Sequence, residues 1–273
     1  MTTISRLTGK KAVAAPGAFN AATALLVEKA GFEAVYISGA GLSNSNGLPD
    51  AGILSREEVL NLSTAIIKSV KIPAIVDIDT GFGGPQEVRE TARLFEAAGA
   101  AAIQIEDQEF PKRCGHLPGK AVIPAEEFVD KIKAARAGRT SPDFLIIART
   151  DARAPQGLDE AIRRGRQYAA AGADMIFPEA LETKEEFREF SKQVNAPLVA
   201  NMTEFGKTPF ITLDEFTELG YSLVLFPMTA FRAAMKAVEE ALAEIKGAGT
   251  QKGLVGRMMT REEIYRLIRY DIG

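Results

Sequence analysis

Short apolar runs alternate with longer amphipathic stretches along the chain. Eight of the apolar runs have the length of β-strands, and they are residues 12–16, 34–38, 73–79, 101–107, 144–149, 174–179, 197–203 and 222–227. These runs are continuously apolar, which is typical of parallel strands that are covered on both faces. The pattern therefore predicts an α/β fold with a buried parallel sheet.

The stretches between these runs have the spacing of amphipathic helices. Examples are residues 55–70, 86–98, 125–137 and 158–171. Ser55 and Glu58 form a capping-box pattern at the start of the first one. Helices of this length between strands are the connections that parallel strands require.

A weak repeat joins helix ends to strands at residues 30–38, 98–106, 171–179 and 219–227. Each copy has a helix end, a glycine, a few small or polar residues and a strand, and glycine suits the left-handed position that closes a helix. Eight such βα units with short links favour a closed (β/α)8 TIM barrel. The main alternative is an open doubly wound sheet, but no GxGxxG motif follows the first strand.

A length of 273 residues is typical of one α/β barrel, and no linker or low-complexity segment interrupts the chain. We therefore expect a single domain over residues 1–273. Residues 250–273 follow the last barrel helix and are expected to form a C-terminal helical extension. Within it, residues 259–270 carry an apolar stripe that is suited to packing on a partner subunit.

Composition and charge exclude several classes of partner. The 33 basic and 36 acidic residues are mixed along the chain without long basic runs, so no nucleic acid is expected. No apolar run approaches the roughly 18 residues of a membrane span. The apolar stretch near the start is broken by Pro16 and Gly17, which argues against a signal peptide. A single cysteine excludes an intrachain disulfide and favours a cytoplasmic location.

Nearly every predicted strand has a polar residue at its carboxyl end, where barrels carry their chemistry. These residues are Ser38, Asp77, Asp79, Glu106, Asp107, Arg149, Asp151, Glu179, Asn201, Thr203 and, after the last strand, Arg232. So many polar ends on one rim indicate a functional mouth.

Acidic residues dominate two neighbouring strand ends, and they are Asp77, Asp79, Glu106 and Asp107. Such crowding of carboxylates is costly when they are unpaired. A hard divalent cation such as Mg²⁺ or Mn²⁺ would relieve it. The alternative is that these acids pair with Arg149 and Lys112 and bind no metal.

The segment 111–120, PKRCGHLPGK, contains the only cysteine and the only histidine of the chain. It follows a strand end and is rich in glycine, proline and charge, so we expect a loop over the mouth. Lys112, Arg113 and His116 would favour a thiolate at Cys114 and make it a catalytic residue. A Cys–His hydrolase is an alternative, but the nearby acids favour metal-assisted acid–base chemistry. Zinc is not expected, because one Cys and one His cannot form a closed site.

The mouth also offers cations and neutral donors. Arg149, Arg232 and Lys112 are cationic, and Asn201 and Thr203 are neutral hydrogen-bond donors. Guanidinium groups bind carboxylates through two parallel hydrogen bonds. The set therefore suits a substrate with several carboxylates, although each arginine has the alternative role of an ion pair at the rim.

Together these motifs resemble the isocitrate lyase / phosphoenolpyruvate mutase superfamily, most closely its 2-methylisocitrate lyases. The resemblance runs from about residue 7 to about residue 270. It rests on YISGAG (36–41), GLPDAG (47–52), DIDTGFG (77–83), EDQ (106–108), KRCGH (112–116), ARTDA (148–152), FPEA (177–180), NMTEFG (201–206) and FPMTAFR (226–232). The KRCGH motif is typical of the lyases of this superfamily.

The resemblance implies an Mg²⁺-dependent carbon–carbon lyase that cleaves 2-methylisocitrate to pyruvate and succinate in propanoate catabolism. It implies that Asp77 binds the metal directly, that Asp79 and Glu106 reach it through water, and that Asp50 lies behind them. Cys114 would be the general acid, in the same loop as Lys112, Gly115 and His116. The base that takes the hydroxyl proton stays open between Tyr36 and a metal-bound water.

For the substrate the resemblance implies two sets of contacts. The pyruvate part would be held by Tyr36, Ser38 and Gly39. The carboxylates of the other half would be held by Arg149, Glu179, Asn201, Thr203 and Arg232. Phe177 and Leu225 resemble positions that leave room for the extra methyl group.

The resemblance also implies a homotetramer, built as a dimer of dimers with exchanged C-terminal helices. Two other interpretations remain open. One is a 2,3-dimethylmalate-type lyase or a carboxyphosphonoenolpyruvate phosphonomutase-like enzyme of the same superfamily. The other is a barrel that binds an organic acid without catalysis.

Overall fold

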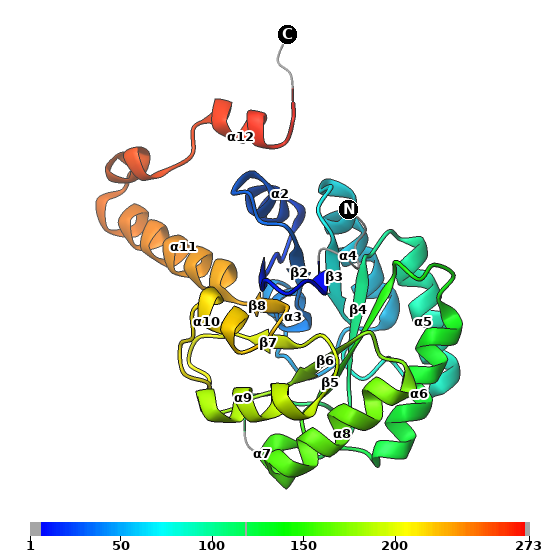
Figure 1. The fold of residues 1–273 in the computed structure, drawn as a ribbon. Helices are drawn as coiled ribbons and strands as arrows, with labels where there is room; N and C mark the ends of the chain where they lie inside the picture. Colours follow the sequence, from blue (N-terminus) through cyan, green and yellow to red (C-terminus); the bar gives the residue numbers. More distant parts are fainter. Residues whose placement is uncertain (1–6, 118, 271–273) are drawn as a thin grey trace.

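A closed ring of eight parallel strands forms the centre of the computed structural model, which describes residues 7–117 and 119–270 (Figure 1). The strands are β1 (Val13–Pro16), β2 (Val35–Ile37), β3 (Ala74–Asp77), β4 (Ala102–Glu106), β5 (Leu145–Thr150), β6 (Met175–Pro178), β7 (Val199–Asn201) and β8 (Leu223–Phe226). Two ladders, β1-β8-β7 and β2-β3-β4-β5-β6, make up most of the ring. Parallel bridges from Gly17 to Tyr36 and from Ile176 to Leu198 close it. The predicted barrel is confirmed, with all eight strands.

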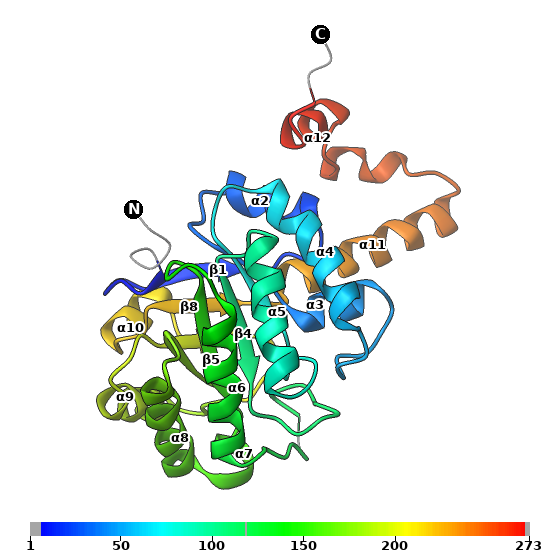
Figure 2. The same cartoon turned by 90° about the vertical axis from the view of Figure 1, so that its right-hand side faces the viewer.

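Helices surround the ring (Figures 1 and 2). They are α2 (Ala21–Lys29), α3 (Gly39–Ser45), α4 (Arg56–Ser69), α5 (Pro85–Ala97), α6 (Ala125–Gly138), α7 (Arg153–Gln156), α8 (Leu158–Ala171), α9 (Lys184–Gln193) and α10 (Leu213–Glu218). The four helices predicted at residues 55–70, 86–98, 125–137 and 158–171 are confirmed as α4, α5, α6 and α8. The capping box is also confirmed, because Ser55 and Glu58 each accept a hydrogen bond from the other's backbone N–H.

Two apolar layers follow from the two-residue period of the strands. On β5, Leu145 and Ile147 pack inside the barrel, whereas Ile146 and Ala148 pack against the surrounding helices. This alternation continues to the carboxyl end of each strand. It therefore decides which polar strand ends face the mouth.

A helical arm leaves the barrel after β8 (Figures 1 and 2). It consists of α11 (Thr229–Ala248), the 3-10 helix η1 (Lys252–Arg257) and α12 (Arg261–Leu267). The helix predicted within residues 259–270 is confirmed as α12, but the arm begins earlier than the predicted extension, because no side chain of α11 is buried. Arg269 beyond α12 lies 2.6 Å from Glu28 of α2.

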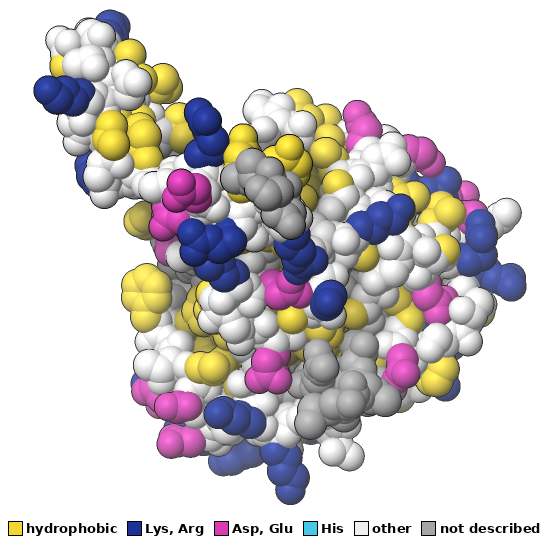
Figure 3. Space-filling view, turned by 90° about the horizontal axis from the view of Figure 1, so that it is seen from above, with side chains coloured by type: hydrophobic (Ala, Val, Ile, Leu, Met, Phe, Trp, Pro, Cys, Tyr) yellow, Lys and Arg dark blue, Asp and Glu magenta, His cyan; other side chains and the backbone are white. Residues whose placement is uncertain are grey.

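Large hydrophobic side chains are exposed along this arm, and several are visible in Figure 3. They include Met235, Val238, Leu242, Ile245, Val255, Met258, Ile264 and Ile268. No helix within the described residues is long and apolar enough to span a membrane. Residues 1–6 and 271–273 of the predicted domain lie outside the described residues, and the single domain over 1–273 stays a prediction.

Candidate active site

The mouth of the barrel contains a cavity of about 400 Å³. Most of the predicted site residues line it, namely Tyr36, Ser38, Asp50, Asp77, Lys112, Cys114, Gly115, His116, Arg149, Phe177, Glu179, Asn201, Thr203, Leu225 and Arg232. The remaining three are Gly39, Asp79 and Glu106, and each contacts one of the lining residues. The structure therefore brings the predicted residues together, while their roles stay predictions.

Strand alternation explains why these side chains meet. Arg149 lies two residues beyond Ile147, so it continues the inward face of β5. In the same way, Asp77 follows the inward Ile75 on β3. Each polar residue therefore projects into the mouth from the end of an apolar inward row.

Asp107 does not belong to the mouth, and the prediction that it joins the acidic crowd is wrong. It follows Glu106 and therefore points to the opposite side of β4, toward α8. Its buried carboxylate accepts hydrogen bonds from the hydroxyls of Thr150 (2.8 Å) and Tyr168 (2.7 Å) and from the Arg164 guanidinium (3.0 Å). Asp107 thus joins the barrel to its helical layer.

The other acids do gather at one side of the mouth. Asp77 accepts hydrogen bonds from the backbone N–H groups of Gly39 and Asp79, both at 3.1 Å. The Lys112 ammonium lies among these acids, 2.8 Å from the Asp79 carboxylate and in direct contact with Asp50. The predicted ion-pair alternative is therefore present in this arrangement.

Burial and crowding perturb the acids of this cluster. Burial, and then the charge of Asp79, raises the pKa of Asp77 to about 6. Burial also raises the pKa of Glu106 well above its ordinary value, against the opposing effect of Arg149. Burial lowers the pKa of Lys112, but Asp79 and Glu106 outweigh it and raise that pKa well above its ordinary value.

The cluster has the donor chemistry of a site for a hard cation. Its groups are carboxylates, and one buried oxygen of Glu106 has no hydrogen-bond partner among the described residues. Carboxylate oxygens are the ligands that Mg²⁺ prefers. Within the described part of the chain, no three acidic, histidine or cysteine side chains stand as a preformed metal site, and Lys112 supplies the compensating charge. The donor set therefore fits Mg²⁺ once the Lys112 ammonium leaves its contacts with Asp50 and Asp79.

Cys114 is half-buried at the cavity, in the segment 111–120, which we call the cysteine loop. Pro118 of this loop lies outside the described residues. His116 lies over the mouth, because its Nε2 atom is 2.8 Å from Glu179 and its Nδ1 atom accepts a hydrogen bond from the N–H of Lys207. The expected loop over the mouth is present. However, Lys112 and His116 contact carboxylates, which differs from the expectation that their charges serve the thiol.

The cationic side of the cavity is centred on Arg149. Its guanidinium lies 3.3 Å from Glu106, donates a hydrogen bond to Asp151 at 2.9 Å and stands 5.3 Å above the Phe177 ring. Burial raises the pKa of Glu179, but Arg149 and His116 outweigh it, and the pKa of that carboxyl is lowered. Arg149 is therefore held rigidly between carboxylates.

The second predicted arginine also lines the cavity. Arg232 is 2.6 Å from the Glu204 carboxylate, and it donates a hydrogen bond to Thr203 at 3.2 Å. Asn201 donates to Glu179 at 3.2 Å. Both arginines thus have the rim ion pairs that the sequence left as their alternative role.

Three polar residues that contact the site or the cysteine loop have no role assigned from the sequence. Gln104 accepts a hydrogen bond from the Tyr36 hydroxyl at 2.6 Å. Gln108 bonds both the N–H and the carbonyl of Arg113. Lys120 binds the carbonyl of Gly115. Strand alternation gives a signal for the two glutamines, because they lie two residues on either side of Glu106.

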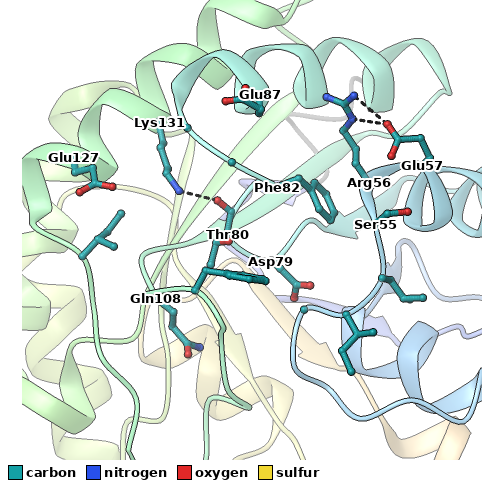
Figure 4. Close-up of a pocket in the computed structure, with 17 residues that line it drawn as sticks. Ser55, Arg56, Glu57, Asp79, Thr80, Phe82, Glu87, Gln108, Glu127 and Lys131 are labelled. Atoms are coloured by element: carbon teal, nitrogen blue, oxygen red, sulfur yellow. Dashed lines mark hydrogen bonds and ion pairs between the residues drawn. The ribbon is translucent and has the colours of Figure 1, made fainter.

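A larger cavity of about 690 Å³ lies beside the mouth (Figure 4). Of the predicted site residues, only Asp79 lines it. Its buried Lys131 donates a hydrogen bond to the carbonyl of Thr80 at 3.1 Å, and burial lowers the pKa of this lysine against the effect of Glu127. Cys114, His116 and the predicted cations Lys112, Arg149 and Arg232 line the smaller cavity instead.

Comparison with known proteins gives consistent matches. A family model described as phosphoenolpyruvate phosphomutase matches residues 4–246. The chain is 54% identical over 258 residues to a 2-methylisocitrate lyase of Aeropyrum pernix, which is 94% of this chain and 83% of that protein.

Solved structures agree with this match. A 2,3-dimethylmalate lyase, described as a PEP mutase/isocitrate lyase superfamily member, has a TM-score of 0.92 at 34% identity, over 98% of this chain and 92% of that one. A phosphonopyruvate hydrolase in complex with oxalate and Mg²⁺ has a TM-score of 0.88 at 37% identity, over 98% and 95%.

We predict that Asp107→Asn lowers the free energy of unfolding by roughly 3 kcal/mol, because an amide N–H₂ would face donors and leave the buried Arg164 poorly compensated. Urea unfolding measures this change. The control Asp130→Asn, on the exposed surface of α6, should stay within about 0.5 kcal/mol of the parent chain. Equal stability of both variants and the parent chain would contradict the structural role of Asp107.

Proposed function

Because the chain belongs to the phosphoenolpyruvate phosphomutase family, we propose that it is an Mg²⁺-dependent carbon–carbon lyase that cleaves 2-methylisocitrate to pyruvate and succinate. The family membership confirms the resemblance inferred from the motifs. One observation carries the proposed chemistry. Cys114, the only thiol of the chain, lines the same cavity as the buried Asp77 and the cation Arg149.

We propose that Asp77 holds Mg²⁺, with Asp79, Glu106 and Asp50 around it, and that Mn²⁺ can replace Mg²⁺. The crowding of buried acids and the raised pKa of Asp77 support this assignment. So does the related phosphonopyruvate hydrolase, which is described with oxalate and Mg²⁺. When bound, the cation would neutralise these acids and act as a Lewis acid at the reacting oxygen of the substrate.

Cys114 is the proposed proton donor. The substrate hydroxyl gives its proton to a water molecule, its C–O bond becomes the carbonyl of pyruvate, and the adjacent C–C bond breaks. The electron pair of that bond goes to the succinate half, which takes the proton of the Cys114 thiol. The resulting thiolate regains a proton from solvent.

Tyr36 is expected to act as a neutral hydrogen-bonding group rather than as the base. Burial, and then the charge of Asp77, raises the pKa of Tyr36 well above its ordinary value. Its hydroxyl also donates to Gln104 inside the barrel. Tyr36, with Ser38 and Gly39, is therefore suited to orient the pyruvate half.

The succinate half is assigned to the opposite side of the cavity. Arg149, Arg232, Asn201 and Thr203 would bind its carboxylates, with Glu179 holding Arg149 and Asn201 in place. Arg232 contacts Glu204, so a bound carboxylate would compete with that acid. Phe177 and Leu225, both fully buried at the cavity wall, offer an apolar surface for the methyl group.

A 2,3-dimethylmalate lyase is the second candidate, since a solved enzyme of that name has the same fold at 34% identity. Apolar pockets discriminate one methyl group by only about 1–3 kcal/mol. The higher identity to a 2-methylisocitrate lyase favours the first candidate. A barrel that only binds acids is disfavoured, because such a protein has no need for a thiol at the cavity.

We also propose that the arm mediates a homotetramer with exchanged helices, because large exposed apolar surfaces mark protein–protein contacts. A cytoplasmic location is part of the proposal, since the thiol must stay reduced in order to donate a proton. The expected ligands are small di- or tricarboxylates, not nucleic acid.

For activity, we predict that the chain with Mg²⁺ releases pyruvate from 2-methylisocitrate and that EDTA abolishes the reaction. Cys114→Ala should lower the rate by at least about two orders of magnitude, because the carbanion loses its proton donor. A panel that includes isocitrate and 2,3-dimethylmalate, with detection of pyruvate and glyoxylate, measures this. Glyoxylate from isocitrate as the main product would contradict the assigned substrate.

For assembly, we predict that the chain elutes as a tetramer of 29.4 kDa subunits in size-exclusion chromatography with light scattering. Leu242→Asp should lower the mass, because the exchange of arms would bury the new charge. Lys133→Asp, on the exposed surface of α6, is the matched control and should keep the parent mass. A parent chain that elutes as a monomer would contradict the proposed assembly.

A further inference from the structure

Lys120, the last residue of the cysteine loop, is buried, with only 1% of its side chain exposed. Its ammonium donates hydrogen bonds to the carbonyl of Gly115 and to the Asp151 carboxylate, the latter at 2.7 Å. A buried charge is tolerated only when it has such partners. The position of Lys120 therefore depends on both of them.

Asp151 connects this lysine to the cationic side of the cavity. Its two oxygens accept hydrogen bonds from Arg149, at 2.9 Å from Nε and 3.0 Å from Nη2. Charge-assisted hydrogen bonds of this kind are short and directional. A continuous buried chain thus runs from the Gly115 carbonyl through Lys120 and Asp151 to Arg149.

The position of Gly115 decides where Cys114 lies. Gly115 is packed so tightly that a Cβ atom there would be 2.4 Å from Nη2 of Arg149 and 2.6 Å from Cγ of Glu179. Cys114 is the preceding residue, and its own carbonyl accepts a hydrogen bond from Leu117 at 2.9 Å. Because peptide units are rigid, a bond at the Gly115 carbonyl limits the positions that the neighbouring thiol can take.

We propose that Lys120 is a positioning residue whose ammonium, held by Asp151, fixes the Gly115 carbonyl and so keeps the Cys114 thiol over the cavity. The proposal rests on the proposed function only in taking Cys114 as the proton donor. Lys120 acts through the backbone and needs no contact with the substrate. Its loss frees the loop while the acid cluster and Arg149 keep their other partners.

The test is the rate at which iodoacetamide alkylates Cys114, the only thiol of the chain, in the protein without metal or substrate. Lys120→Met removes the ammonium and keeps most of the stem. Rates are compared at the high-pH plateau, where the thiol is fully ionised, so that a changed thiol pKa does not enter. We expect at least about ten-fold faster alkylation, which corresponds to a change of roughly 1.4 kcal/mol in the free energy of loop opening. The circular dichroism spectrum should stay unchanged.

Lys133→Met is the matched control, because this lysine is exposed on α6, and it should react at the parent rate. An unchanged plateau rate in a folded Lys120→Met protein would overturn the proposal. If that variant does not fold, the plateau alkylation rate is measured on Lys120→Gln, which is neutral but polar. An unchanged rate there would likewise overturn the proposal. Hydrogen exchange on the parent chain needs no variant. Protection of the amides of residues 115 and 116, which lie beside the carbonyl that Lys120 binds, supports the proposal, and exchange at the unprotected rate overturns it.

Turnover separates this proposal from the proposed function. If the chain cleaves 2-methylisocitrate, Lys120→Met should lower kcat by about ten-fold or more and change KM little, because proton delivery is impaired rather than binding. If the parent chain does not cleave this substrate, the alkylation rates still decide whether Lys120 holds the loop.

Discussion

Mutual repulsion between buried carboxylates is the constraint on which this site depends. Strands β3 and β4 end next to each other, and alternation turns Asp77 and Glu106 into the same part of the mouth. Their pKa values are raised chiefly by burial, so the fold keeps these acids where ionisation is unfavourable. Such an arrangement requires a compensating positive charge, from a side chain or from a bound cation.

Positively charged side chains surround these buried carboxylates. Lys112 contacts Asp50 and Asp79, while Arg149 contacts Glu106. Because Lys112 and Cys114 belong to one loop, charge compensation and the position of the thiol are linked. A divalent cation that displaces Lys112 would therefore act on the loop as well as on the acids. The charges that stabilise the loop are thus the same ones to which we assign a role in catalysis, as is common where pKa values are perturbed.

The sequence predicts the barrel well because each βα unit carries its own local pattern, and strand lengths, helix ends and the Ser55 capping box follow from short-range rules. The polar strand ends are also visible in the sequence. However, the sequence does not show on which side of the strand each polar residue lies, as Asp107 illustrates. Adjacent acids look equivalent in a sequence, yet strand alternation sends Glu106 into the mouth and Asp107 toward Arg164. The partners of Lys120 depend on how the loop folds back over the mouth, which no local pattern specifies.

Direct metal binding tests whether the crowded acids bind a divalent cation. The measurement is a titration of the metal-free protein with Mn²⁺, with the free ion followed by electron paramagnetic resonance. We expect one bound Mn²⁺ per chain, an affinity lowered about 100-fold or more by Asp77→Asn, and unchanged binding in Asp107→Asn. A parent chain that leaves Mn²⁺ free, with its acids neutralised by Lys112 and Arg149 alone, would contradict it.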